Sequence, residues 1–477
     1  MTLTPLPIEH AYMTFLFPFA YHPQNRKELC KHLESEGFTF FTLQNKELEN
    51  AFYGDDIMVS HEEIAQFFYP FVEDKLFPTI SHAQEFLRFS KSFKVNGHLK
   101  TKHEIFPYEL LSIDITLCPF GNGIITTRLK MTDEIRDFSD VVNFIHYFRI
   151  LEAKLDEEKG TSHHFTFGHY QSTSDLLFQY FLPFLEDYLI DYKTNTFGGL
   201  PFLEDERMLA SAYLLCEKNT EIINEHLFRL GQVDGKKPDG KPFISSTNPD
   251  YIADYVAEHT HMRWAPTSYI VTSTQAQITI SNRPFSRSIR DIEKFMGKYY
   301  YNLLIHYFYK MMLLKVSFEH SEISWNKDKF VVDDLIELIT RFSSHYYFDE
   351  VVVRSEGKEI SHMLRKIFRI QENYLETKTT LDNLYRALED RSDKRNNTLL
   401  FILTVFTVVS GIFGMNLVIE EWNGQVNWSN VWQFSIFEWF ALFTALSGIT
   451  LSFVLICYSA YTVIRNHLRR YMRNGLK

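Results

Sequence analysis

The chain has 477 residues, of which 16% are aromatic, and its formal net charge is −11 at pH 7. So many aromatic residues exclude a largely disordered protein, and the acidic balance disfavours binding to DNA or RNA, which needs a basic face to neutralise phosphates. With a mean hydropathy of −0.19, most of the chain is expected to be soluble, with any membrane part confined to the C-terminal end.

Residues 1–290 are expected to form a cytoplasmic α/β regulatory domain. Leu111–Cys118 alternates apolar and polar side chains and turns through Phe120–Gly123 into Ile124–Met131, a pattern that predicts a β-hairpin. Helical spacing follows in Phe138–Leu155, and Ser268–Ser281 predicts further β structure. From the sequence, we assign no regulatory site to this domain.

A loop rich in glycine and proline, Asp234–Pro242, contains the domain's one resemblance to a phosphate-binding loop. Gly235, Gly240 and Lys241 have the required spacing, but Pro242 stands where a Mg²⁺-binding serine or threonine is needed. Its lysines could hold a phosphate-bearing ligand, although a solvated surface turn is the favoured interpretation.

The same half of the chain contains two groups of histidines. Metal binding is disfavoured for both groups because no carboxylate or thiolate framework accompanies them. The groups are His163, His164 and His169, and His259 and His261. The sequence contains no GxxxxGK[ST], GxSxG or HExxH motif, so we assign no catalytic residue and expect a protein that is not an enzyme.

Residues 291–397 are expected to form a helical stalk. Phe295–Val316 is strongly apolar, but Lys298, Lys310 and Lys315 interrupt it, so a buried helix of the soluble part is favoured over a membrane span. Glu359–Asn397 contains no proline or glycine and predicts one long helix. Its polar face is either solvated or the wall of a hydrophilic vestibule.

An uncharged apolar run, Thr398–Asn416, leads to the prediction of a first transmembrane helix at 398–417. At about 1.5 Å per residue, a helix of this length crosses the roughly 30 Å hydrocarbon core of a bilayer. Mostly small or polar residues recur on one face at steps of three and four. Going back from Gly414, they are Gly411, Thr407, Thr404, Leu400, Asn397 and Asp393. The stripe either packs helices together or lines an ion path, and we prefer the pore.

A second transmembrane helix is predicted at 436–464, after an extracytoplasmic loop at 418–435 and before a basic tail at 465–477. The loop carries Glu420 and Glu421 and no lysine or arginine. The positive-inside rule then places both termini in the cytoplasm of a two-span protein of the cell (inner) membrane.

A large N-terminal domain, a long helix, two C-terminal spans and the motif Gly414-Met415-Asn416 together resemble the CorA family of divalent-cation channels. The resemblance is carried by residues from about 290 to the end. It implies a funnel-shaped homopentamer in the lipid bilayer that conducts Mg²⁺ or a related divalent cation and is gated by its cytoplasmic domain.

The same resemblance implies roles for individual residues. Gly414, Met415 and Asn416 would form the selectivity filter, with Asn416 holding hydrated Mg²⁺ through its waters. Glu420 and Glu421 would raise the cation concentration at the outer mouth. The stripe from Gly411 to Asp393 would line the pore, with Leu400 as its hydrophobic gate.

An alternative function rests on the enlarged N-terminal domain. Some CorA-like proteins accompany nucleotide-signalling defence systems such as type III CRISPR. In this alternative, the chain is a membrane effector whose conformational equilibrium is shifted by a nucleotide messenger.

Overall fold

The computed structural model describes residues 4–416 except 56, 82–83, 133–134, 156–157, 191–199, 204–206 and 323–328, and beyond them 432, 435–437, 439–440, 442–444, 446–448, 450 and 453–454. Side chains at 329–330, 388, 390–392, 394, 409 and 411–416 are outside this description. The chain divides into two compact units, Met1–Thr380 and Leu381–Lys477.

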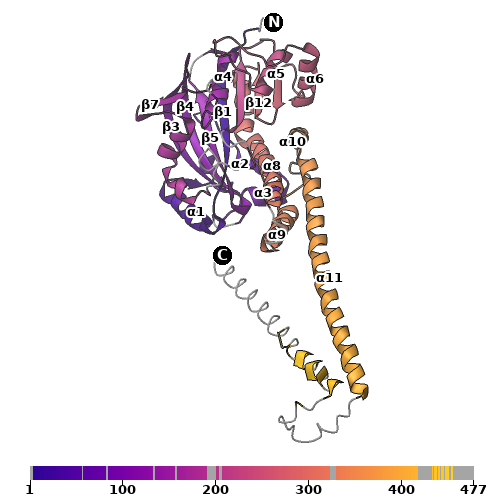
Figure 1. Ribbon diagram of the computed structural model, residues 1–477. Coiled ribbons are helices and arrows are strands. Elements are labelled where there is room, and N and C mark those ends of the chain that lie inside the picture. The colour runs from indigo at the N-terminus through magenta and orange to yellow at the C-terminus, as the bar shows by residue number, and fades with distance from the viewer. Residues whose placement is uncertain are drawn as a thin grey trace. The chain divides into compact units, whose positions relative to one another are not determined.

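The first unit is built on one 12-stranded mixed sheet (Figure 1). Its main path runs β10-β11-β12-β9-β1-β5-β4-β3-β7-β8, with β2 paired to β3 and β6 to β1. Neighbouring strands are antiparallel except β12 and β9, which pair in parallel. The strands are β1 (Pro7–Ala20), β2 (Thr39–Phe40), β3 (Leu87–Lys100), β4 (Ile105–Leu117), β5 (Asn122–Met131), β6 (Arg136–Asp137), β7 (Ser162–Phe165), β8 (Gly168–Tyr170), β9 (Leu209–Cys216), β10 (Thr260–His261), β11 (Ser268–Thr272) and β12 (Ala276–Ser281).

Helices cover both faces of the sheet, and each face has its own apolar core. Because side chains alternate along a strand, β1 sends Phe15 and Phe17 into one core and Tyr12 and Leu16 into the other. The first core is completed by α1 (Arg26–Ser35), α4 (Phe138–Phe148), α5 (Asn224–Gln232) and α6 (Pro249–His259). The second contains α2 (His61–Ala65), α3 (Pro70–Leu76), α7 (Phe285–Lys294), α8 (Tyr300–Ser321), α9 (Lys329–His345) and α10 (Ser355–Ile367).

The apolar segment at Phe295–Val316 corresponds to one π-helical turn at Phe295–Tyr299 followed by α8, which packs in the second core. Its polar side chains are accommodated individually. Lys298 pairs with Glu63 at 3.0 Å, and Lys315 donates to the Phe120 carbonyl at 3.0 Å. Burial lowers the pKa of His306 to about 3, so this ring is neutral at physiological pH.

The predicted continuous helix Glu359–Asn397 is wrong in one respect, because the chain breaks at Phe368 and Arg369. Helix α10 ends at Ile367, and Arg369 adopts a positive φ of 53° before α11 (Ile370–Asn416) begins. A residue in the left-handed conformation ends a helix even where the sequence has no glycine or proline to mark the position.

The two predicted membrane spans, at 398–417 and 436–464, are contradicted. Among the residues that the structure describes, no helix combines the length and the apolar character needed to cross a bilayer. The apolar run whose side chains are described, Thr398–Val408, amounts to only about 16 Å of α11. The two-span funnel fold, the membrane-protein and ion-channel assignments and the inner-membrane location all depended on these spans, and all conflict with this finding.

Candidate functional site

A cavity of about 310 Å³ lies beside α10 in the first unit. We call it the α10 cavity. Its basic side chains are Lys358, His362 and Arg365, which share one face of α10 with Ser361 because they are spaced by three and four residues. The segment Asp349–Val352 lines the opposite side.

The α10 cavity is lined by two carboxylates, Asp349 and Glu350, and two cations, Lys358 and Arg365, but only Lys358 and Glu350 form an ion pair among the described residues. Lys358 forms an ion pair with Glu350 at 2.7 Å and donates to the Tyr69 hydroxyl at 3.2 Å. The hydrogen bond from Lys358 is the main cause that lowers the pKa of Glu350. Arg365, by contrast, has no ion pair with any carboxylate that the structure describes, and its Nε finds no hydrogen-bond acceptor among those residues.

Arg365 is held in place by neutral groups. Its Nη1 donates to the Tyr347 hydroxyl at 3.3 Å and its Nη2 to the Phe348 carbonyl. The guanidinium also lies 5.4 Å from the centre of the Tyr347 ring, close enough for a cation–π contact. The positive charge therefore stays available to an anion.

A buried polar layer lies behind the α10 cavity, between α8 and α10. Ser361 donates to the Asn302 side-chain carbonyl at 2.8 Å, and His306 Nδ1 donates to the Asn302 backbone carbonyl at 2.7 Å. Among the described residues, Asn302 Nδ2 and His306 Nε2 have no partner although both residues are fully buried. Unsatisfied groups of this kind call for a physical explanation, because each costs the free energy of its lost hydration.

A short chain of contacts connects the α10 cavity to the start of α11. The Tyr347 hydroxyl that accepts from Arg365 also donates to Gln371 Oε1 at 3.1 Å. The Tyr347 ring stacks on Tyr374, with ring centres 3.8 Å apart and planes 7° from parallel. Tyr347 therefore contacts both Arg365 and the first two turns of α11.

The other side of α10 is fastened to the sheet. Trp264 Nε1 donates to Glu356 at 2.6 Å, and His261 on β10 contacts Glu359 at 2.7 Å. Arg263 pairs with Glu359 at 2.8 Å. These contacts attach the side of α10 that faces away from the α10 cavity.

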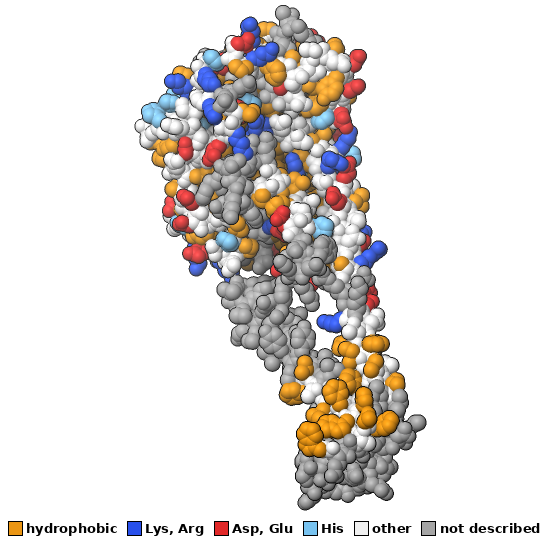
Figure 2. All heavy atoms as spheres, viewed as in Figure 1, with side chains coloured by type: hydrophobic (Ala, Val, Ile, Leu, Met, Phe, Trp, Pro, Cys, Tyr) orange, Lys and Arg blue, Asp and Glu red, His pale blue; other side chains and the backbone are white. Residues whose placement is uncertain are grey.

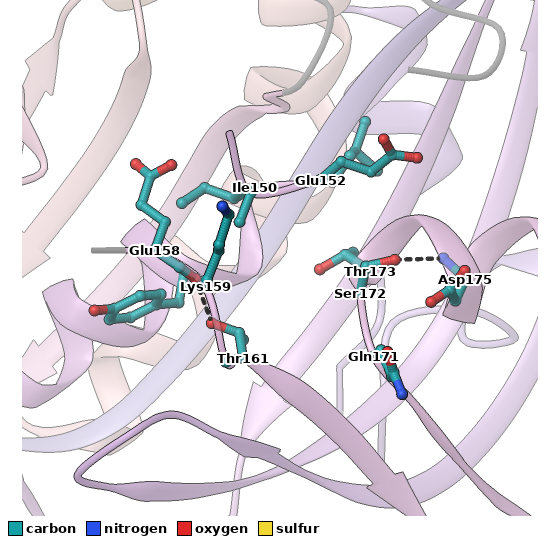
Figure 3. A pocket seen from close by; sticks show the side chains of 13 residues that line it. Ile150, Glu152, Glu158, Lys159, Thr161, Gln171, Ser172, Thr173 and Asp175 are labelled. Carbon is teal, nitrogen blue, oxygen red and sulfur yellow. Dashed lines mark hydrogen bonds between the residues drawn. The ribbon is translucent and has the colours of Figure 1, made fainter. Parts of the chain in front are cut away.

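A second cavity, of about 360 Å³, lies between the loop at 150–161 and the segment at 171–175 (Figure 3). Its lining is polar and acidic, with Glu152, Glu158 and Asp175 against one lysine, Lys159. Glu158 is engaged by Arg207 at 2.8 Å. The single lysine of this cavity faces three carboxylates, and none of the lining residues belongs to α11, so the cavity suits an anionic ligand less well than the α10 cavity.

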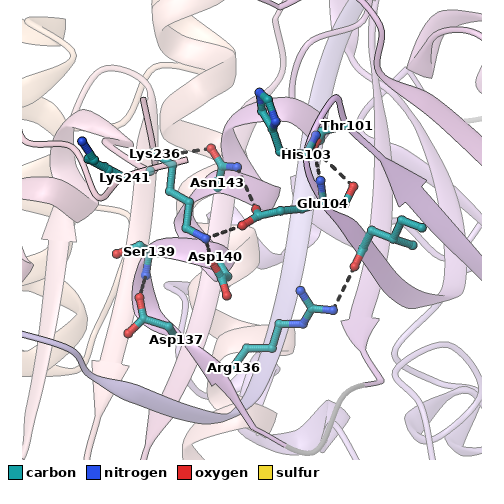
Figure 4. A network of polar contacts seen from close by, with 12 residues as sticks. Thr101, His103, Glu104, Arg136, Asp137, Ser139, Asp140, Asn143, Lys236 and Lys241 are labelled. Carbon is teal, nitrogen blue, oxygen red and sulfur yellow. Dashed lines mark hydrogen bonds and ion pairs between the residues drawn. The ribbon is translucent and has the colours of Figure 1, made fainter. Parts of the chain in front are cut away.

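The loop Asp234–Pro242 does not offer its lysines together. Lys236 lies among Glu104, Asp140 and Asn143, and its ammonium group pairs with both carboxylates (Figure 4). Lys241 is exposed and lies 3.6 Å from Asp239. Lys236 therefore ties the loop to the sheet and α4 rather than holding a phosphate.

The predicted histidine groups separate in the fold. His163 is buried and contacts the Tyr108 hydroxyl and Thr173, each at 3.0 Å, whereas His164 and His169 lie together on the β7–β8 hairpin with ring centres 4.5 Å apart. Within the described part of the chain, no group of three histidine, cysteine or acidic residues is arranged to hold a metal ion.

The predicted filter and pore residues are only partly described. Asp393, Asn397, Leu400, Thr404 and Thr407 lie exposed on α11. The two threonine hydroxyls donate to helix carbonyls four residues earlier, both at 2.8 Å. For Gly411, Gly414, Met415 and Asn416 only helical backbone is described, and Glu420 and Glu421 lie outside the described residues, so their predicted roles stay predictions.

Comparison with protein-family models, with curated proteins and with solved structures finds no match to this chain.

Proposed function

We propose that the first unit is a non-catalytic regulatory module that binds a nucleotide through its phosphate in the α10 cavity and passes the bound state to α11. The observation that carries this proposal is Arg365, a half-buried guanidinium in a cavity with no carboxylate partner among the described residues. Arginine is well suited to phosphate because its planar donors match the phosphate oxygens.

Arg365 takes part both in the proposed phosphate binding and in the contacts that lead to α11. A phosphate that takes donors from Arg365 competes with the Tyr347 hydroxyl, which then changes its contacts with Gln371 and Tyr374 on α11. A ligand shifts such an equilibrium only by its difference in affinity for the two arrangements. The phosphate must therefore contact Arg365 more favourably in one arrangement of Tyr347 than in the other.

The test is calorimetric titration of the full chain with a panel of linear and cyclic nucleotides, followed by amide hydrogen exchange of residues 370–380. We expect one nucleotide to bind and to change exchange in this segment. Arg365→Gln should weaken binding by about 10–100-fold, as expected for loss of a charged hydrogen bond.

Lys366→Gln is the matched control, since Lys366 is the next residue on α10 and pairs instead with Glu258 at 2.9 Å. It should leave the affinity unchanged. Binding that is equally strong in the Arg365→Gln variant would refute the site, and binding without any change of exchange at 370–380 would refute the coupling to α11.

A further inference from the structure

A second feature, separate from the α10 cavity, is a charged cluster inside the core between the sheet and α8. Arg88 on β3, Asp114 on β4 and Arg128 on β5 lie on adjacent strands and are 3%, 0% and 0% exposed. The strand register places Asp114 opposite Ser90 and Thr126, so all these polar side chains share the face that packs against Tyr300 and Tyr301 of α8.

The cluster carries one more positive than negative charge. Although burial favours the neutral acid, Arg128 and Arg88 together hold the pKa of Asp114 below its ordinary value, so the carboxylate is ionised. Burial raises the pKa of Tyr300 and Tyr301, which therefore stay neutral. Two guanidinium groups thus share one carboxylate in a region without water access.

The three donor nitrogens of Arg88 are all engaged. Its Nε lies 3.0 Å from Asp114 Oδ2 and donates to the Ser90 hydroxyl at 2.9 Å, and its Nη2 donates to Asp114 Oδ1 at 3.3 Å. Its Nη1 donates to the hydroxyls of Tyr53 and Tyr301. Arg88 needs no further partner.

Arg128 is different, because only its Nη1 is engaged, by Asp114. Its Nε and Nη2 are buried and find no acceptor among the described residues. In the planar guanidinium group, the Nε–H and the adjacent Nη2–H point out from the same edge, as a two-pronged donor that fits one anion. The Tyr300 ring, centred 4.5 Å from Arg128 Cζ, is a cation–π partner but cannot accept both of these hydrogens in the guanidinium plane.

We propose that this open edge of Arg128 binds one small monovalent inorganic anion, chloride or a planar oxyanion such as bicarbonate. One such ion supplies the missing negative charge and accepts both unpaired hydrogen bonds. Arg128 is fully buried on β5 against Tyr300 of α8, which favours an ion of this size over a nucleotide, and it does not line the α10 cavity. A bound anion stabilises the native state in proportion to its free concentration.

The first test is thermal unfolding of the full chain at constant ionic strength while sodium gluconate is replaced by sodium chloride or sodium bicarbonate. We expect a saturable upward shift of the Tm by about 2 °C or more with one of the two small anions. Arg128→Lys keeps the charge but removes the two-pronged edge, and should abolish the shift. Arg136→Lys, at a half-buried arginine on β6, should retain it.

A second test does not depend on a variant that folds. In crystals of the unchanged protein grown with bromide or nitrate, an anion should lie within hydrogen-bond distance of Arg128 Nε and Nη2. A water molecule at this position, together with equal Tm values in gluconate, chloride and bicarbonate, would overturn the proposal.

Discussion

Asp114 balances the charge of two buried arginines, and its loss should be among the most damaging single changes in the chain. In Asp114→Asn, Arg88 and Arg128 would remain buried with no ionised partner among the described residues. We expect the free energy of unfolding to fall by about 3–5 kcal/mol, as when one member of a buried ion pair is removed. Urea denaturation measures this change.

The control for this prediction is Asp55→Asn. Asp55 pairs with Lys94 at 2.7 Å, but the pair is exposed, with 78% and 48% of the two side chains accessible. Exposed pairs contribute little to stability. Similar losses in the two variants would contradict the assignment of Asp114 to a buried charged cluster.

His163 makes stability depend on pH. Burial lowers its pKa to about 3. Thr173 donates its hydroxyl hydrogen to the Phe148 carbonyl, so it accepts from His163 Nε2–H, and Nδ1 accepts from the Tyr108 hydroxyl. As pH falls below the unfolded value of about 6.5, the unfolded chain takes up a proton that native His163 refuses until about pH 3, so stability is lost over this range.

The variant His163→Gln removes this proton uptake. The slope of unfolding free energy against pH between 6.5 and 5 should decrease by up to about 1.4 kcal/mol per pH unit. His146 and His306, whose pKa values burial lowers to about 4 and about 3, contribute to the slope that remains. Equal slopes in the unchanged protein and in His163→Gln would contradict the prediction.

At the scale of elements, the turn between β4 and β5 depends on Gly121. Phe120 and Gly121 both have positive φ, 66° and 74°, and a Cβ at Gly121 would lie 2.8 Å from the Tyr21 backbone oxygen. Gly121→Ala therefore adds a backbone clash to the cost of a left-handed alanine, about 1–2 kcal/mol.

Gly240 provides a control with the same backbone strain and no clash. Its φ is 81°, and a Cβ there would have no neighbour within 4 Å. Gly240→Ala should therefore lose clearly less stability than Gly121→Ala in chemical denaturation. Equal losses would show that the Tyr21 contact does not restrict the turn.

Local patterns in the sequence explain which elements could be predicted. The hairpin of β4 and β5 follows from alternation, and helix α4 follows from helical spacing, although α4 ends at Phe148 and not at the predicted Leu155. The break at Arg369 carries no local signal. The predicted spans were inferred from hydropathy, segment length and flanking charges, and the described part of α11 does not extend that apolar character over the length a bilayer requires.

The candidate sites could not be predicted from local patterns, because they are formed by residues far apart in the sequence. Lys358, Ser361, His362 and Arg365 share a helix face that spacing could have revealed, but their partner segment Asp349–Val352 comes from a separate loop. Asp114 and Arg128 interrupt apolar strands at inward positions, which is a visible signal of a buried charge. Arg88 becomes their partner only through the register of three strands.

At the scale of the whole molecule, the second unit carries a run of exposed apolar side chains along one helix. Both apolar cores of the first unit are complete by Tyr374. In the second unit, α11 exposes large apolar side chains, among them Leu400, Phe401 and Leu403 at 59%, 69% and 63% (Figure 2). Contiguous exposed apolar surface of this kind promotes association in water.

A chain that ends after Thr380 should therefore fold alone and be less prone to associate than the full chain. We expect one cooperative thermal transition by circular dichroism, with a Tm close to that of the first transition of the full chain, and a single monomeric species in size-exclusion chromatography with light scattering. A chain that ends after Arg369 tests the same boundary, because it loses buried Ile370 and the Tyr374 ring that stacks on Tyr347. Its Tm should be lower, since core and stacking contacts are removed together. If the chain ending at Thr380 unfolded without cooperativity, the first unit would need Leu381–Lys477 for its stability, and the division into two independently stable units would be wrong.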